Sequence, residues 1–188
     1  MTEPRVVITE LCAQDWPFLF ELWRIPAVMR YADELPGLRG WSKETSAEEA
    51  WDLYQEQRAA LGPSYTQLIL KMIDRTPIGE SFFAPLPDGF TLDKWVKPEG
   101  MTCLIGDIKL RPEHWGQGLG TEGMRQVVAW LFRNTHCALL VVPPHSKNPA
   151  AARVYRKAGF THFEEKQSWR GHTIMELWRE EYEATYGP

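Results

Sequence analysis

Apolar residues at helical spacing follow a glycine-rich segment in the second half of the chain. They recur at intervals of one, three and four residues, at Met124, Val127, Val128, Leu131 and Phe132. Because an α-helix turns once every 3.6 residues, these positions share one face. The pattern predicts an amphipathic helix that starts after Gly120 and packs against a core.

A second helix is marked at both of its ends. Asn148 is a typical N-cap residue, and Pro149 then takes the first helical position, where a missing N–H is tolerated. Gly159 is placed to end the helix, since glycine readily adopts the left-handed conformation found at many helix C-termini. Its inward face is predicted to consist of Ala151, Val154, Tyr155 and Ala158.

The N-terminal half predicts one strand followed by two helices. Val6–Thr9 is a short β-branched run suited to a strand, and Asp15 is placed to cap the first helix. Ser46 and Glu49 form the pattern of a capping box, which predicts the start of the second helix. The prolines and glycines of residues 30–41 predict a loop between the two helices.

Several β-branched and apolar runs predict the strands of a sheet. Two of them flank residues 74–76, a connection of ordinary length for an antiparallel hairpin. The expected strands are Thr66–Ile73, Pro77–Ala84, Thr102–Leu110, Ala138–Val142, Thr161–Lys166 and Thr173–Trp178. Residues 85–100 mix proline, glycine and charge, so we expect a surface loop or insertion within a single domain that spans residues 1–188.

Composition and charge narrow the class of protein. With 188 residues, of which 44% are hydrophobic, the chain can bury a full core. Its 21 basic and 25 acidic side chains give a formal net charge of −4, which argues against binding to nucleic acid. No apolar run approaches the roughly 20 residues that span a bilayer, and the N-terminus lacks a signal-peptide pattern. We therefore expect a cytoplasmic protein without nucleic-acid or membrane partners.

The cysteines and histidines predict no metal site. Cys12, Cys103 and Cys137 are odd in number and lack CxxC spacing, so we expect buried thiols and neither a disulfide framework nor a zinc site. The five histidines have no metal-ligand spacing and are expected on the surface or in loops.

Gly116, Gly118 and Gly120 lie between a predicted strand and the first amphipathic helix. Glycines there let backbone N–H groups turn toward a ligand, and the helix adds unpaired N–H donors with a partial positive charge. Residues 116–121 are therefore a candidate cradle for a pyrophosphate, with a plain tight turn as the alternative. A dinucleotide-binding βαβ unit fits poorly, because its glycines are spaced differently and no acidic residue closes the next strand. The Walker pattern also fails, since no Gly-Lys-Ser/Thr follows.

Two segments resemble the signatures of the GNAT superfamily of N-acetyltransferases. The run I-G-D-I-K-L-R-P-E-H-W-G-Q-G-L-G-T-E from Ile105 resembles the coenzyme A signature, and N-P-A-A-A-R-V-Y-R-K-A-G-F from Asn148 resembles the second signature. Trp115 stands where the first signature usually has glutamine or arginine. The form around Trp115 resembles that of ribosomal-protein N-terminal acetyltransferases, and aminoglycoside acetyltransferases are also similar in this region.

The resemblance implies an α+β fold, with a mixed and mostly antiparallel sheet that splays near Leu110 and carries helices on both faces. It also implies that acetyl-CoA binds as co-substrate and that no metal is needed. The residues implied to contact the coenzyme are Ile108, Lys109 and Leu110 beside the pantetheine, Gly116, Gln117, Gly118, Leu119, Gly120 and Thr121 at the pyrophosphate, and Asn148 at the pantetheine arm.

Acetyl transfer to an amine requires a proton donor and a proton acceptor. The resemblance implies that Tyr155 lies near the coenzyme sulfur, where a phenol with a reference pKa of about 10 can protonate the departing thiolate. A core aromatic is the alternative for this residue. Asp107 is the first candidate for the base, with an ordinary strand carboxylate or ion pair as the alternative, and Glu80 is a weaker candidate.

The expected acceptor is a primary amine, either a protein N-terminus or a small molecule such as an aminoglycoside. The resemblance implies that the loop after the first helix and the last strand pair wall its pocket. The residues expected there are Tyr31, Asp33, Glu34, Trp169, Arg170 and His172. The two acidic residues would attract a cationic amine, with a solvated loop as the alternative. A non-catalytic acyl-CoA-binding domain is the competing class of function, and a homodimer stays open.

Overall fold

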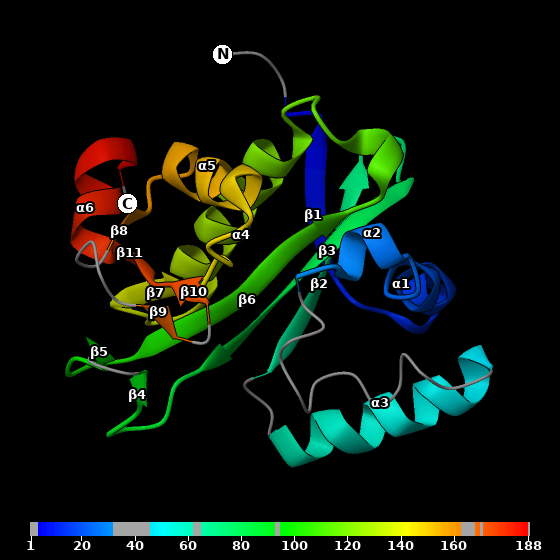
Figure 1. The fold of residues 1–188 in the computed structure, drawn as a ribbon, viewed down its shortest axis with the longest axis horizontal. Coiled ribbons are helices and arrows are strands. Elements are labelled where there is room, and N and C mark those ends of the chain that lie inside the picture. Colours follow the sequence, from blue (N-terminus) through cyan, green and yellow to red (C-terminus); the bar gives the residue numbers. More distant parts are fainter. Residues whose placement is uncertain are drawn as a thin grey trace.

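The computed structural model describes residues 4–31, 46–61, 65–92, 95–162, 168–169 and 171–187, and its centre is a seven-stranded sheet in the order β1-β2-β3-β6-β7-β11-β8 (Figure 1). The strands of this sheet are β1 (Val6–Glu10), β2 (Thr66–Met72), β3 (Pro77–Pro85), β6 (Thr102–Leu110), β7 (Leu139–Val142), β8 (Thr161–His162) and β11 (Met175–Trp178). Two short hairpins pair β4 (Thr91–Leu92) with β5 (Trp95–Val96) and β9 (Ser168–Trp169) with β10 (His172–Thr173). The helices are α1 (Trp16–Leu22), α2 (Pro26–Met29), α3 (Ala47–Leu61), α4 (Leu119–Asn134), α5 (Pro149–Lys157) and α6 (Arg179–Tyr186).

The sheet divides at one parallel strand pair. The other neighbouring strands that the structure describes run antiparallel, but β6 and β7 are parallel and pair only through residues 102–104 and 139–141. Beyond Leu104, β6 continues to Leu110 beside β3, whereas β7 ends at Val142. The expected α+β fold with a splayed, mostly antiparallel sheet is confirmed, and the splay begins earlier along β6 than predicted (Figure 1).

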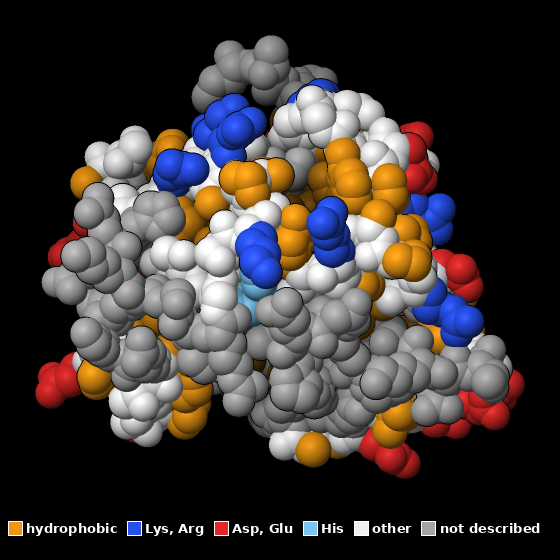
Figure 2. Space-filling model, in the orientation of Figure 1, with side chains coloured by type: hydrophobic (Ala, Val, Ile, Leu, Met, Phe, Trp, Pro, Cys, Tyr) orange, Lys and Arg blue, Asp and Glu red, His pale blue; other side chains and the backbone are white. Residues whose placement is uncertain are grey.

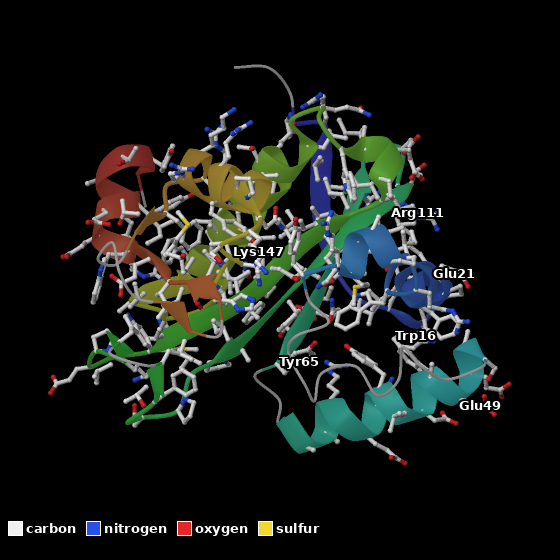
Figure 3. The ribbon with its side chains drawn as sticks, viewed as in Figure 1. Trp16, Glu21, Glu49, Tyr65, Arg111 and Lys147 are labelled. Carbon is white, nitrogen blue, oxygen red and sulfur yellow. A yellow bond between two sulfur atoms is a disulfide. The ribbon has the colours of Figure 1, made fainter. Side chains whose placement is uncertain are left out.

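Hydrophobic cores lie on both faces of β3. Phe82 packs with residues of α1, α2 and α3, whereas its neighbour Phe83 packs with residues of α4 and α5. Successive side chains of a strand point to opposite faces, so each face of the sheet receives its own helical layer. Figure 3 shows Trp16 between α1 and α3, where its indole N–H donates to the Ala47 carbonyl at 2.6 Å.

Two of the predicted helix caps are confirmed. The Ser46 hydroxyl accepts from the N–H of Glu49 at 3.1 Å, and the Glu49 carboxylate accepts from the N–H of Ser46 at 3.2 Å. At the start of α5, the Asn148 side chain accepts from the N–H of Ala151 at 3.2 Å. Each cap depends on residues within four positions of one another, which is why the sequence pattern was sufficient.

The predicted cap at Asp15 is wrong because a distant residue competes for its carboxylate. Asp15 occupies the N-cap position of α1 without making a capping bond, since its carboxylate pairs instead with Lys71 of β2 at 2.8 Å. The segment 85–100, expected to be a surface loop or an insertion, contains the short β4–β5 hairpin, whose apolar side chains Leu92 and Trp95 pack with residues of β7. The helix α6 was not predicted at all.

The expectation of three buried thiols is also wrong. Cys103 of β6 and Cys137 are joined in a disulfide, with their Cα atoms 6.3 Å apart, whereas Cys12 is free and exposed. The parallel pairing of β6 with β7 brings Cys103 close to the segment that leads into β7, which contains Cys137. An odd number of cysteines therefore did not exclude one pair, because long-range strand pairing decides which cysteines meet.

A β-bulge in β6 depends on Gly106. The register of β3 against β6 shifts opposite Phe82, and a Cβ added at Gly106 would lie 1.9 Å from Cζ of Phe82. No side chain fits between this strand and the Phe82 ring. The bulge is part of the strand segment that leads to the candidate active site.

We predict that Gly106→Ala lowers the free energy of unfolding by about 1–3 kcal/mol, as overpacking does, because the new methyl group must displace the Phe82 ring. Phe82→Leu replaces the ring by a smaller side chain. The double variant should therefore lose about 1 kcal/mol less free energy of unfolding than the sum of the losses in the two single variants. Urea denaturation of the four proteins measures this coupling. Strictly additive costs would show that Phe82 is not what restricts position 106.

Candidate active site

A pocket of about 590 Å³ opens where β6 parts from β7. Its walls come from the second half of β6, the glycine-rich loop before α4, the first turns of α5, the end of α2, and the segment after β7. These elements are far apart in sequence. The splay of the sheet brings them together, since it leaves a gap between the strands that no neighbouring strand fills.

Most of the residues predicted to contact the coenzyme line this pocket. They are Ile108, Lys109, Leu110, Gly116, Gly118, Gly120, Thr121 and Asn148. Gln117 and Leu119 are not among the lining residues. The Gln117 side chain donates to the Glu113 carbonyl at 2.7 Å, and Leu119 packs in a core cluster with residues of β1, β2 and β6.

The glycine-rich loop has the conformation that its glycines permit. Gly116 and Gly118 have φ values of 73° and 81°, in the left-handed region that other residues rarely adopt. Gly118 is also the N-cap of α4, a helix of 16 residues. In the described part of the chain, the N–H groups of Gly118, Leu119 and Gly120 have no protein acceptor. The loop therefore offers N–H donors at a positive helix end, as an anion site requires.

The edge of β6 presents backbone groups to the pocket. The N–H of Arg111 bonds to the carbonyl of Ile78 on the β3 side, so the alternate residues Ile108 and Leu110 direct their backbone groups to the opposite side. Trp115 donates its indole N–H to the Leu110 carbonyl at 2.8 Å. Apart from side-chain bonds such as this one, no described strand pairs with this edge of β6 beyond residue 104, so an extended ligand can bind along it by strand-like hydrogen bonds.

Tyr155 reaches this edge from α5. It is fully buried and packs with Phe160, while a hydrogen bond connects it to the backbone of Ile108. Burial raises the pKa of the Tyr155 phenol, and the nearby Asp107 charge raises it further, while the bond with Ile108 opposes these effects. The hydroxyl therefore keeps its proton across the neutral pH range. Tyr155 is both a core aromatic and a residue of the pocket wall.

The two candidate bases lie in different surroundings. Asp107 lines the pocket, its side chain is 30% exposed, and it pairs with Lys109. Glu80 is completely buried and does not line the pocket; it accepts from the indole N–H of Trp23 at 2.9 Å and from Lys109 at 2.9 Å. Glu80 is therefore poorly placed to meet a substrate, whereas Asp107 combines the ion pair expected as the alternative with access to the pocket.

Burial and charge act in opposite directions on the pair beneath Asp107. Burial raises the pKa of Glu80, and the Lys109 ammonium opposes this rise. Burial alone would lower the pKa of Lys109, but the carboxylates of Asp107 and Glu80 outweigh it and raise this pKa instead. Lys109 therefore stays an ammonium ion despite its burial.

Three aromatic rings form the other end of the pocket. Tyr31 stacks on His145 with ring centroids 5.3 Å apart, and His172 meets His145 edge to face at 5.0 Å. All three residues line the pocket. Tyr31 and His172 were predicted to be acceptor residues, whereas Asp33, Glu34 and Arg170 lie outside the described residues. Trp169 is described only as part of the β9 backbone.

His145 was missed by sequence reasoning. The histidines were expected at the surface or in loops. His145 lies in the segment after β7 and is buried, whereas His172 is a buried residue of the strand β10, for which the expectation is wrong. A β-bridge joins them, and the N–H of Ser146 bonds to the carbonyl of Gly171 at 2.6 Å. Nδ1 of His145 accepts from the N–H of Lys147, which is labelled in Figure 3, at 3.1 Å. This long-range strand pairing leaves no local pattern in the sequence.

Positive side chains border the pocket. Figure 2 shows Lys and Arg side chains in the middle and upper part of the face of the molecule seen in Figure 1. The cations that line the pocket include Arg30, Arg153 and Lys157. Such charge favours a ligand with several negative charges. Among the described residues, no group of three His, Cys, Asp or Glu side chains is placed to hold a metal ion, and no helix is long and apolar enough to cross a membrane.

Comparison with known proteins identifies the family. Residues 5–161 match the family described as "Acetyltransferase (GNAT) domain". Among solved structures, the aminoglycoside acetyltransferase AAC(6')-Ib in complex with coenzyme A is similar, with 22% identity, a TM-score of 0.73, and coverage of 96% of this chain and 98% of that one. A spermidine N-acetyltransferase from Vibrio cholerae, in complex with CoA and spermine, has 17% identity, a TM-score of 0.68, and coverage of 95% and 98%.

The chain therefore belongs to the GNAT acetyltransferase family. Its class is that of acetyl-CoA-dependent N-acetyltransferases, with acetyl-CoA as co-substrate. The similarity to the solved structures is one of fold, and it extends over nearly the whole chain. An aminoglycoside N(6')acetyltransferase from Legionella pneumophila is another example, with 18% identity, a TM-score of 0.67, and coverage of 98% of both chains.

We predict that Gly118→Asp abolishes acetyl-CoA binding, because it adds bulk and negative charge beside the N–H donors of the loop. Gly89→Asp is a matched control, since Gly89 has a similar φ of 73° but lies in a turn outside the pocket. Calorimetry should therefore show coenzyme binding for the control alone. Equal affinities in two folded variants would exclude the loop as the phosphate site.

Proposed function

We propose that this protein transfers an acetyl group from acetyl-CoA to a primary amine by direct attack in a ternary complex. The main support is that four features line one pocket: the glycine-rich loop before α4, the edge of β6, the buried Tyr155 and the aromatic wall that includes Tyr31. The first two suit a long phosphorylated cofactor. The last two lie further along the same pocket, where a second substrate can approach.

The coenzyme would be held mainly by backbone groups. The N–H donors of residues 118–120 would contact the pyrophosphate, and the edges of Ile108 and Leu110 would hold the pantetheine arm beside Asn148. Bound in this way, acetyl-CoA supplies the thioester whose acetyl group is transferred. Because few side chains take part, the geometry of the loop and strand determines binding more than their side-chain chemistry.

The proposed chemical step uses Tyr155 and Asp107. The ammonium form of the acceptor gives up a proton to Asp107, directly or through water, and its nitrogen attacks the thioester carbonyl. The C–S bond then breaks, and the thiolate takes a proton from the Tyr155 hydroxyl. The second proton that the nitrogen must lose to form the amide passes, directly or through water, to the Tyr155 phenolate and restores it. Backbone N–H groups near Leu110 would stabilise the oxyanion that forms between these events. The raised pKa of Tyr155 ensures that its proton is present at neutral pH.

We predict that Tyr155→Phe lowers kcat by about a hundredfold or more while coenzyme affinity stays the same, because only the hydroxyl is lost from a packed ring. Tyr54→Phe is a suitable control, since it removes a buried hydroxyl on the other side of the sheet. Steady-state kinetics and calorimetry separate the two effects. Wild-type turnover by the Tyr155 variant would remove Tyr155 from the chemistry.

The acceptor is a small-molecule or protein amine in this proposal. Two of the related structures are complexes with kanamycin and with spermine, so aminoglycosides and polyamines belong in an initial panel together with N-terminal peptides. Release of the free CoA thiol reports turnover for any amine, and it also tests the proposed function itself. Coenzyme binding without turnover of any amine would instead favour a non-catalytic acyl-CoA-binding domain. We also propose that the chain forms a single domain and that the enzyme acts in the cytoplasm.

We predict that Tyr31→Ala raises the KM for the amine several-fold and leaves that for acetyl-CoA unchanged, because Tyr31 forms the aromatic wall and lies away from the glycine loop. Tyr186→Ala, at an exposed tyrosine of α6, is the control. Kinetics with the best amine of the panel measure both constants. A change confined to the acetyl-CoA constant would assign Tyr31 to the coenzyme.

A further inference from the structure

Three ionisable side chains meet beneath the floor of the pocket. The Lys109 ammonium lies 2.9 Å from the Glu80 carboxylate and forms a second, closer ion pair with Asp107. Two carboxylates thus share one ammonium. The Lys109 and Glu80 side chains are 4% and 0% exposed, whereas Asp107 reaches the pocket. The cluster therefore carries one uncompensated negative charge, and the member through which solvent and ligand can reach it is Asp107.

The ammonium is fixed in place by several elements. It lies 4.5 Å from the centre of the Trp23 ring, and the indole N–H of the same tryptophan donates to Glu80 at 2.9 Å. Gln67 of β2 also donates to Glu80, and Tyr65 donates to Gln67 at 2.8 Å. The position of Lys109 therefore depends on α1, β2 and β3. A buried ion held by so many partners has little freedom to move.

We propose that Lys109 is a positioning residue, which holds the Asp107 carboxyl group in place at the pocket wall, where it can receive the acceptor amine. The inference rests on the proposed function and deepens it. Asp107 and Lys109 are two residues apart on β6, so their side chains leave the same face of the strand. An ammonium within hydrogen-bond distance favours the charged form of a carboxylate and fixes its orientation.

The remaining groups around Asp107 do not supply this positive charge. Tyr155 of α5 and Tyr65, just before β2, both interact with Asp107, and burial raises the pKa of each phenol, so both stay neutral. Glu80 of β3 contributes a further negative charge. Arg30 and His145 line the same pocket at its acceptor end. Lys109 is thus the cation in contact with Asp107 in the described residues.

The test is the pH profile of Lys109→Met in the full-length enzyme, with an amine found by the screen. This substitution removes the ammonium that contacts the Asp107 carboxyl group. The acid limb of kcat/KM should therefore move to higher pH by about one unit. We also expect kcat to fall about tenfold, part of the hundredfold or more that a positioned base contributes.

Lys97→Met is the matched control. The Lys97 side chain is also 4% exposed, and it is held by Asp88 and by the carbonyls of Pro98 and Gly100, outside the active-site pocket. The same chemical change there should leave the acid limb where it is. A purely structural role for Lys109 would reduce stability in the same way without moving the pH profile.

Two further variants distinguish a lost positioning role from a loss of folding. Lys109→Met combined with Glu80→Gln removes one charge of each sign, so no new unpaired charge stays buried, and the acid limb should still move. Lys109→Arg keeps the positive charge and should restore a profile close to that of the wild type. An unshifted acid limb in the double variant would overturn the positioning role alone. A wild-type protein that acetylates no amine would overturn the proposed function, and this inference with it.

Discussion

The parting of β6 from β7 is the constraint on which the rest of the structure depends. Two parallel strands that stayed paired along their whole length would leave no space between them and no open backbone edge. Here pairing stops after Leu104, and the bulge at Gly106 changes the register against β3 at the point where the strands diverge. The edge of β6 is then free to face α5. Both the pocket and the position of Tyr155 follow from this divergence.

The coenzyme end and the base of the pocket differ in electrostatic character. At the coenzyme end, the N-termini of α4 and α5 open into the pocket, and Arg153 and Lys157 add positive charge. At the base of the pocket, the Glu80, Lys109 and Asp107 cluster has an excess of negative charge. In the proposed function, a polyanionic cofactor would be attracted to the glycine-rich loop, and a cationic amine would be attracted to Asp107.

The sequence predicted those parts of the molecule that short segments determine. Helices α4 and α5, the caps at Ser46 and Asn148, and the two signature segments each depend on residues close together in the chain. Most of the predicted coenzyme residues line one pocket for the same reason, because they belong to one strand, one loop and one helix start. Their roles stay predictions until binding is measured.

What the sequence could not show are contacts between distant segments. The ion pair of Asp15 with Lys71, the disulfide of Cys103 with Cys137, and the bridge that buries His145 all join residues at least 27 positions apart. Such contacts follow from strand order and register, which a single sequence specifies only through the whole fold. Lys109 illustrates this well: in the sequence it is one residue of a strand, and only the packing of Trp23 and Glu80 around it shows that it is a buried cation.

The short parallel pairing of β6 with β7 has a consequence for how the two halves of the chain hold together. The strands on either side are joined in the sheet by three register pairs, and the helices α4 and α5 complete the connection. A coenzyme bound along the edge of β6 and against α5 would contact both halves and so substitute for the missing strand pairs. Because a ligand that binds only the native state stabilises it by mass action, the cellular supply of acetyl-CoA would then govern how long the folded enzyme persists as well as how fast it works.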